Sequence, residues 1–187
     1  MNHPAEVAIH SFLQNVMLGK TSMDKDILDL ISKDVRDALG RQFSGEKRKF
    51  KLRMSNIGRK KCQLWFEKNH PGEKISDSPY FLINMILGDI IEAVFKGLLR
   101  AADVKFDDSE QVSLPIKGGH VDGTYDLVLN GKVDDVKSAS PWAYENKFID
   151  FETLQSKDSF GYVSQLVGYS KAKGVPVGGW WVVNKAN

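Results

Sequence analysis

The sequence predicts a single mixed α/β (α+β) domain, with helices in its first half and a β-sheet in its second half. Three observations predict this class. In three segments before residue 101 the apolar residues recur at helical spacing, whereas from Val112 onward they alternate with polar residues as in strands. The 187 residues, 42% of them apolar, suffice for one core, because a chain of this size buries roughly 70% of the surface that it exposes when unfolded.

The helices of the first half are predicted from spacing and end signals. They are expected at Ala5–Met17, Asp24–Leu39 and Phe81–Arg100, and the basic stretch at residues 47–61 connects to a helix entry that leads into Cys62–Lys68. Ser22 or Asp24 would cap the second helix, and Gly40 would end it. The charged residues of the helix at Phe81–Arg100 recur every three or four positions, so they form one stripe and the apolar remainder packs inward. The members of this stripe are Asp89, Glu92, Lys96 and Arg100.

The strongest local signal in the second half is a β-hairpin. Asn130-Gly131 favours the positive φ angles of a two-residue type I′ turn between strands expected at Val121–Leu129 and Lys132–Ser138. The remaining expected elements are a helix at Phe160–Lys173, which Gly174 ends, and a buried strand at Gly179–Val183.

The two-residue turn determines which side chains of the hairpin face each other. Counting outward from the turn places Asp126 opposite Asp135. Two carboxylates with Cβ atoms about 4.5–5.5 Å apart repel each other unless a cation lies between them. Lys137 lies on the same face as Asp135, and Asp134 points the other way. Two acids and one ammonium suit a hard divalent cation and phosphodiester hydrolysis, and the alternative is a solvated ladder of mixed charge.

Charge is segregated along the chain although the net charge is only +2. Residues 47–61 contain eight basic residues and no acid, whereas residues 103–135 contain eight acids and three lysines. A basic face of this kind can hold a polyanion while an acidic pocket holds cations. A solvated basic loop next to an acidic surface is an equally good interpretation of the charges alone.

The single cysteine and the N-terminal residues predict the compartment. Cys62 cannot form a disulfide within the chain, nor a four-cysteine metal site by itself, which favours a reducing compartment. The N-terminus lacks a secretory signal pattern, and the longest apolar stretch, 81–100, is too polar for a membrane span. We therefore expect a cytoplasmic protein with no membrane partner.

The string GTYDLVLNGKVDDVKSAS at 123–140 resembles the core signature of the PD-(D/E)XK nuclease superfamily, in which an Asp and a following Asp/Glu-x-Lys hold the catalytic metal. Gln165 and Tyr169 share one helical face and resemble the QxxxY motif of the RecB-like branch. Gly88–Glu92 resembles the helix that brings an acid to the site in that branch. These elements follow the family's order across residues 85 to 185.

The resemblance implies a restriction-endonuclease-like core, with a central mixed sheet flanked by helices and an N-terminal helical cover. Residues 1–187 would form a single nuclease domain, with N-terminal helices at 1–50 and the core at 51–187. The implied catalytic residues are Asp126, Asp135, Lys137, Gln165 and Tyr169. The implied ligands of Mg²⁺ or Mn²⁺ are Glu92, Asp126, Asp135 and the backbone carbonyl of Val136.

Several of these residues have structural alternatives. Glu92 could instead pair with Lys96 on a solvated helix face, and Gln165 and Tyr169 could be polar residues on a half-exposed helix. His120 could contact a phosphate or be a polar residue at a strand edge.

The first metal ligand has a second candidate. Asp122 ends a Gly-x-x-Asp sequence at 119–122 that resembles the RecB-like form, and it precedes Asp135 by thirteen residues, as in some members. It lies on the same strand face as Asp126. We favour Asp126 because the tight turn sets it opposite Asp135, although a bulge at Gly123 would reverse this choice.

The family also guides what is expected of the basic stretch and of Cys62. Arg59, Lys60 and Lys61, together with His120, would contact DNA phosphates. RecB-like nucleases of the CRISPR adaptation type carry four cysteines for an iron–sulfur cluster, and Cys62 stands where the first would be. The other three are absent, so no iron–sulfur cluster is expected and Cys62 should pack in the core.

The function expected from the resemblance is Mg²⁺- or Mn²⁺-dependent hydrolysis of DNA phosphodiester bonds. Small proteins of this appearance resemble phage-encoded exonucleases that process DNA ends in replication, recombination or repair, which would place the chain in the host cytoplasm. No base-reading motif is apparent. Two alternatives stay open, namely a structure-specific endonuclease and a non-catalytic DNA-end-binding module with a nuclease fold.

Overall fold

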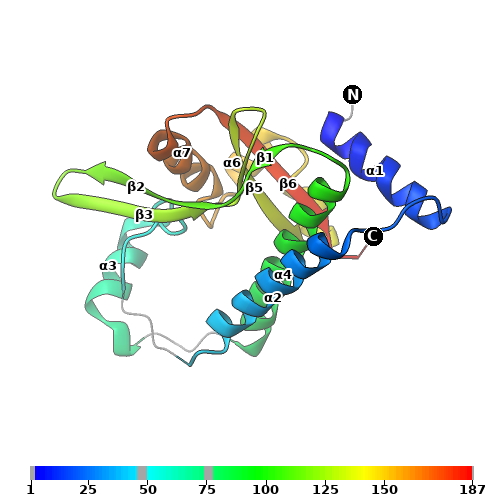
Figure 1. Ribbon diagram of the computed structural model, residues 1–187. Helices are drawn as coiled ribbons and strands as arrows, with labels where there is room; N and C mark the ends of the chain where they lie inside the picture. The colour runs from blue at the N-terminus through cyan, green and yellow to red at the C-terminus, as the bar shows by residue number, and fades with distance from the viewer. Residues whose placement is uncertain (1–2, 46–49, 74–77, 187) are drawn as a thin grey trace. The chain divides into compact units, whose positions relative to one another are not determined.

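The computed structural model describes residues 3–45, 50–73 and 78–186, and the chain divides into two compact units (Figure 1). We call Met1–Gly45 with Ser78–Lys105 the helical unit, and Glu46–Asp77 with Phe106–Asn187 the sheet unit. The structure is therefore mixed α+β, as predicted. The division differs from the expected boundary at residue 50, because the helix before the sheet groups with the N-terminal helices.

The helical unit contains α1 (Pro4–Met17), α2 (Lys25–Gln42) and α4 (Pro79–Ala101), close to the predicted ranges. Both α1 and α2 pack on α4. The α2–α4 contact is close at Gly97, where an added Cβ would collide with the side chain of Ile31. A small residue on α4 thus lets the two helices approach.

The helix ends agree with the prediction in one case and not in another. Gly40 does not end α2, which continues to Gln42. A glycine ends a helix by adopting a positive φ, and Gly40 does not do so. Gly174, by contrast, has φ 75° and ends α7 (Tyr162–Lys173) as expected.

The charged stripe of α4 is not fully solvated. Lys96 is buried, and its Nζ donates a hydrogen bond to Glu92 Oε1 at 2.7 Å. Gln42 donates from Nε2 to Asp89 Oδ2 at 3.0 Å. The expected Glu92–Lys96 pair is present, but the expectation that only apolar residues of this helix point inward is wrong at Lys96.

The described strands form a four-stranded sheet and a separate two-stranded ribbon. The sheet has the order β1 (Phe106–Asp107), β4 (Leu127–Leu129), β5 (Lys132–Ala139) and β6 (Val177–Asn184). The ribbon joins β2 (Glu110–Ile116) to β3 (Gly119–Tyr125). Since β4 and β5 are antiparallel while β5 and β6 are parallel, the sheet is mixed, as predicted.

The predicted hairpin register is confirmed next to the turn, but the predicted pair Asp126–Asp135 is not part of the ladder, because Asp126 lies in a bend. Asn130 and Gly131 have φ angles of 52° and 73°, which a two-residue I′ turn requires. The pairs of β4 and β5 are Leu127↔Asp134, Val128↔Val133 and Leu129↔Lys132. The turn residues alone therefore determined which face each later side chain of β5 occupies.

The strand expected at Val121–Leu129 is wrong as a single element. A bend at Asp126 ends β3 and starts β4, and the chain passes there from the ribbon to the four-stranded sheet. On β3, Asp122 O accepts the N–H of Met54 at 2.9 Å. This contact gives β3 a backbone partner of its own, away from the sheet that β4 joins.

The core of the sheet unit forms around Met54, which is completely buried. A Cβ on Gly123 would lie 2.5 Å from Met54 Cγ and 2.7 Å from Tyr169 Cε1, so β3, the Met54 segment and α7 meet without space for a side chain. The buried residues of this cluster are Met54, Val112, Val121, Tyr125, Val128, Val133, Leu166 and Tyr169.

Three short helices complete the sheet unit. In α3 (Lys61–Asn69) no residue is buried, and Cys62 is exposed, so the prediction that Cys62 packs in the core is wrong. A nine-residue helix with its aromatic residues exposed has no interior for a cysteine to enter. After α3, the chain forms a 3₁₀ turn at Pro71–Glu73. The helices α5 (Pro141–Asn146) and α6 (Phe151–Ser156) were not predicted.

Candidate metal-dependent site

Two acids and a lysine come together where β4 and β5 leave their hairpin. Asp135 lies on β5 and is 1% exposed, and Lys137 Nζ lies 2.5 Å from its Oδ2. The Lys137 side chain is 19% exposed and therefore reaches the surface beside the buried acid. We call Asp126, Asp135 and Lys137 the acid–lysine centre.

Asp126 joins this centre through the backbone of β5. Its Oδ2 accepts the N–H of Val136 at 2.6 Å. The last backbone pair of β4 and β5 is Leu127↔Asp134. Just beyond it, at the bend, this hydrogen bond from side chain to backbone connects the two segments. The bend therefore directs the Asp126 carboxylate toward the strand that carries Asp135 and Lys137.

The electrostatics of the centre are dominated by its two carboxylates. Burial opposes the charged form of Lys137, but the attraction of Asp135 and Asp126 outweighs it and raises the pKa of the ammonium above its ordinary value. Lys137 is therefore a cation at neutral pH.

Asp134 points to the opposite face of β5, as expected, and has a structural partner there. Its Oδ1 accepts the N–H of Gly179 at 2.6 Å, and the side chain is buried. The register of β5 and β6 shifts between Val133 and Asp135. This carboxylate therefore ties β6 to β5 at an irregular point of the parallel ladder.

The two polar residues of α7 pair with each other, as their spacing predicted. Gln165 Nε2 donates to the hydroxyl of Tyr169 at 3.2 Å. Burial raises the pKa of Tyr169 to about 12; the Gln165 hydrogen bond works in the opposite direction, and Asp126 and Asp135 raise it further. The structure thus brings the Tyr169 side chain under the influence of the acid–lysine centre, although Tyr169 is also a core residue.

Asp122 has partners of a different kind. Lys51 Nζ lies 2.5 Å from its Oδ2, and His120 Nε2 lies 3.5 Å from the same oxygen. The hydrogen bonds from Lys51 and Ser113 hold the pKa of Asp122 below its usual value. The structure therefore pairs Asp122 with Lys51 of the loop before α3 and places it near His120 of the ribbon.

Glu92 belongs to the helical unit, where its described partner is Lys96. Its predicted role as a metal ligand stays a prediction. The same holds for the backbone carbonyl of Val136.

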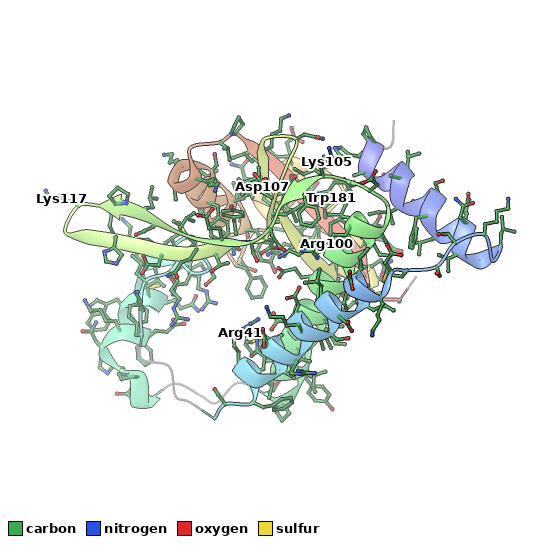
Figure 2. The ribbon with its side chains drawn as sticks, viewed as in Figure 1. Arg41, Arg100, Lys105, Asp107, Lys117 and Trp181 are labelled. Carbon is green, nitrogen blue, oxygen red and sulfur yellow. The ribbon has the colours of Figure 1, made fainter. Side chains whose placement is uncertain are left out.

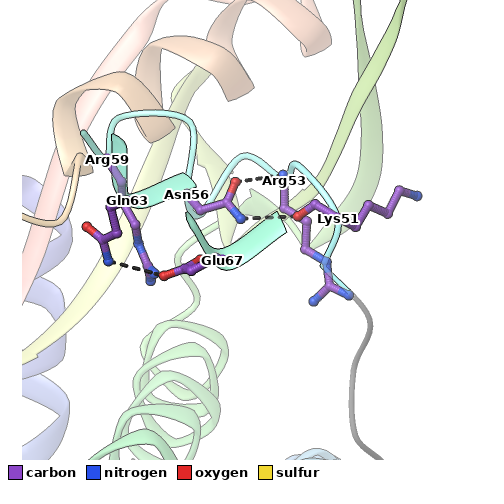
Figure 3. A network of polar contacts seen from close by, with 6 residues as sticks. All are labelled: Lys51, Arg53, Asn56, Arg59, Gln63 and Glu67. Carbon is purple, nitrogen blue, oxygen red and sulfur yellow. Dashed lines mark hydrogen bonds and ion pairs between the residues drawn. The ribbon is translucent and has the colours of Figure 1, made fainter. Parts of the chain in front are cut away.

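The basic residues expected to bind phosphate lie on an ordered loop and on α3 (Figure 3). Asn56 holds this loop, because its Oδ1 accepts the N–H of Arg53 at 2.8 Å and its Nδ2 donates to Lys51 O at 3.1 Å. Lys60 and Lys61 are exposed, and Arg59 Nη1 lies 3.4 Å from Glu67 Oε1.

The other residues that were expected to contact phosphate lie on the ribbon or outside the described residues. His120 is 60% exposed near the tip of the ribbon, which Lys117 marks in Figure 2. Lys47, Arg48 and Lys49 fall outside the described part of the chain. The exposed cations leave room for phosphate contacts, and their role in DNA binding stays a prediction.

A group of aromatic residues that was not predicted from the sequence lies next to the centre. Lys137 Nζ lies 5.3 Å from the ring centroid of Tyr162, and Lys147 Nζ lies 4.5 Å from the same centroid. Burial lowers the pKa of Lys147, with Asp158 acting against that change. The available sequence signal was the pair Phe160 and Tyr162 at the start of a helix, which by itself indicates only packing.

The residues of the centre suit a magnesium-type ion in number and chemistry. Within residues 3–45, 50–73 and 78–186, no group of three or more His, Cys, Asp or Glu side chains is placed to hold a metal. Mg²⁺ usually takes only one or two protein carboxylates and keeps water or substrate oxygens as its other ligands. Asp126 and Asp135, which both act on Lys137, fit such a partial set.

Among the described residues, no helix is long and apolar enough to span a membrane.

Similarity to known proteins does not identify the function of this chain. The sequence matches no protein-family model and no curated protein. Among solved structures, the chain is similar to the one described as "Crystal structure of SSO0001", with 12% sequence identity and a TM-score of 0.45. The alignment covers 89% of this chain and 76% of that chain. A likeness this distant assigns no activity.

Proposed function

We propose that the chain is a metal-dependent nuclease that hydrolyses DNA phosphodiester bonds and acts as an exonuclease on DNA ends. The observation that supports the proposal is the acid–lysine centre, in which Asp126 in the bend before β4 and Asp135 on β5 both attract Lys137. Two carboxylates around one ammonium leave an excess of negative charge, which a bound divalent cation would balance.

The order of elements along the chain also supports this proposal. A helix with an acid precedes the hairpin, β5 carries the Asp-x-Lys sequence, and α7 with its Gln165–Tyr169 pair leads into a strand parallel to β5. This order agrees with the resemblance to the PD-(D/E)XK nucleases of the RecB-like branch. We therefore extend the proposal to membership of that superfamily.

Each side chain of the centre has a proposed task. Asp126 and Asp135 would hold Mg²⁺ or Mn²⁺, with the Val136 carbonyl as a further proposed ligand. Such an ion polarises a phosphate and makes its bound water more acidic. Lys137 would orient the attacking water or stabilise the charge that develops on the phosphate. Gln165 and Tyr169 would hold the DNA strand.

The proposed substrate contacts are to phosphates. Arg59, Lys60, Lys61 and His120 would neutralise the backbone, which makes binding independent of sequence and weaker at high salt. Nothing in the described residues resembles an element that reads base edges, so the proposed enzyme does not select a sequence.

The substrate test uses end-labelled linear single- and double-stranded DNA and closed circular DNA, each incubated with purified protein in Mg²⁺, Mn²⁺ or EDTA. We expect degradation of linear DNA only, and none in EDTA. Cutting of circles would instead identify an endonuclease. DNA binding without cleavage in any metal would contradict the nuclease proposal and favour a DNA-end-binding module.

A further inference from the structure

Three aromatic rings form a stack beside the acid–lysine centre. The Tyr162 ring is stacked with two neighbours, and its centroid lies 5.7 Å from that of Phe160 and 6.0 Å from that of Phe148. The interplanar angles are 17° and 25°, so the rings are close to parallel. Stacked rings of this kind restrain one another, and the position of Tyr162 is therefore well defined.

A buried lysine reinforces this stack. Lys147 is 8% exposed, and its Nζ lies 4.5 Å from the Tyr162 centroid, 5.2 Å from that of Phe160 and 5.9 Å from that of Phe148. The electron-rich faces of the rings attract an ammonium that has lost most of its water. Lys147 thus joins the three rings into one unit.

The backbone of Tyr162 is fixed as well. Asp158 accepts hydrogen bonds from the N–H groups of Gly161, Tyr162 and Val163 at 2.8, 2.9 and 2.9 Å. These bonds satisfy the first turn of α7, as a capping carboxylate does. The ring consequently projects from an anchored helix end.

This anchored ring is a second restraint on Lys137. Its ammonium lies 5.3 Å from the Tyr162 centroid and 2.5 Å from Asp135 Oδ2. A carboxylate that binds a divalent cation has less charge to offer an ammonium, because both compete for the same oxygens. The aromatic face is uncharged, and a divalent cation on Asp135 does not displace Lys137 from it.

We propose that Tyr162 is the positioning residue for Lys137, holding its ammonium at the centre through the face of the ring. The role in catalysis rests on the proposed nuclease function, while the restraint on Lys137 does not. The aromatic ring of Tyr162, and not its hydroxyl group, is what restrains the ammonium of Lys137. A side chain without an aromatic face therefore frees Lys137, and phenylalanine does not.

The first test compares the steady-state kinetics of Tyr162→Phe and Tyr162→Leu on linear DNA in Mg²⁺. Tyr162→Leu is expected to lower kcat roughly tenfold, as the loss of one cation–π contact implies, with KM nearly unchanged. Tyr162→Phe should keep kcat within about threefold of the wild type, since it retains the ring. An equal loss in both variants would overturn the proposal, as would full activity of Tyr162→Leu.

A second readout does not depend on cleavage. The wild-type protein and both variants are treated with an amine-reactive reagent at one pH, and labelling of Lys137 is followed by mass spectrometry, with and without Mg²⁺. Labelling should rise several-fold in Tyr162→Leu and stay at the wild-type level in Tyr162→Phe. Lys173, which lies 5.4 Å from the Tyr125 centroid, is the internal control and should not change.

A shape-matched replacement guards against loss of packing in the leucine variant. Pentafluorophenylalanine in place of Tyr162 keeps the ring and reverses its charge distribution, so it should free Lys137 as leucine does. Protection of Lys137 in that protein would contradict the proposal. If the wild type cleaves no DNA while the labelling pattern holds, the nuclease function fails and the positioning role stands.

Discussion

Asp122 and Asp126 are four residues apart on one stretch of chain, and the structure gives them different surroundings. Asp122 lies on the ribbon and pairs with Lys51, a side chain that is 52% exposed. Asp126 lies in the bend, accepts the backbone N–H of Val136, and acts on Lys137. Asp122 therefore belongs to an ion pair with an exposed lysine, whereas Asp126 is half-buried beside a second acid and a lysine.

The difference shows that side chains stop alternating between the two faces of a sheet where the strand ends. Residues four apart share a face only on a continuous strand. The bend at Asp126 interrupts the alternation and moves the chain from the ribbon to the four-stranded sheet. At this junction Asp126 lies near a second acid, Asp135, whereas Asp122 within the ribbon lies next to Lys51.

The largest effect expected from this comparison concerns catalysis. Asp126→Asn should lower the rate of Mg²⁺-dependent cleavage by about 10²-fold or more, because it removes one of the two charges proposed to hold the ion. Asp122→Asn should lower it by less than about threefold, because its carboxylate serves Lys51. Initial rates on linear DNA measure both.

A larger loss of activity in Asp122→Asn than in Asp126→Asn would contradict this assignment. If Asp122→Asn were the more damaging change, the first ligand would be Asp122 and the thirteen-residue spacing to Asp135 would be the relevant one. Circular dichroism of both variants would confirm that each is folded.

The hairpin and its acids could be predicted because their signals are local. Asn130-Gly131 sets the turn and the register, and alternation from there places Asp135 and Lys137 on one face of β5. The four-residue spacing of Gln165 and Tyr169 likewise determined their pairing. Each inference needed only neighbouring residues and a fixed backbone period.

The features that could not be predicted depend on residues far apart in the sequence. The bend at Asp126 accompanies packing of Gly123 against Met54, and the stacking of Tyr162 with Phe148 brings together side chains from separate elements. Cys62 is exposed because nothing in the described residues buries α3. Helical spacing identifies a helix, but it does not show which neighbour covers it.

Gly123→Ala should destabilise the protein at the position between the two acids. The added Cβ would lie 2.5 Å from Met54 Cγ, so β3 must move away from Met54 and α7 at a cost of about 3 kcal/mol. Gly119→Ala on the same strand is the matched control, since its Cβ meets no atom within 4 Å. Urea denaturation of both variants measures the difference. Equal stability would show that β3 tolerates a side chain at position 123.

Asp134→Ala should have a somewhat smaller effect on stability. The N–H of Gly179 would lose its acceptor in a partly buried position, which costs about 1 kcal/mol. Asp134→Asn keeps an oxygen acceptor and should lose less than the alanine variant. Urea denaturation again provides the measurement, and an unchanged midpoint for Asp134→Ala would exclude a role for this carboxylate in joining β6.

Lys51→Gln should have the smallest effect, with no measurable change in the urea midpoint, because the pair is exposed. It should nevertheless raise the pKa of Asp122 toward the ordinary value of 3.8, since the Lys51 hydrogen bond is the largest cause of its lowering. A group with a lowered pKa stabilises the fold above its ordinary pKa and loses that contribution as pH falls through the folded value. NMR titration of the carboxyl groups tests this, and an unchanged pKa would mean that Lys51 is not bound in solution.

The central claim is that Asp126, Asp135 and Lys137 form a metal-dependent hydrolytic site. Its most direct test is the initial rate of linear DNA degradation in Mg²⁺ by the wild type and by Asp135→Asn, which keeps the size of the side chain and removes its charge. Glu152→Gln, a change at an exposed acid of the same unit, is the control. We predict a loss of at least about 10²-fold for Asp135→Asn, wild-type activity for Glu152→Gln, and no wild-type activity in EDTA. Undiminished cleavage by folded Asp135→Asn would contradict the claim.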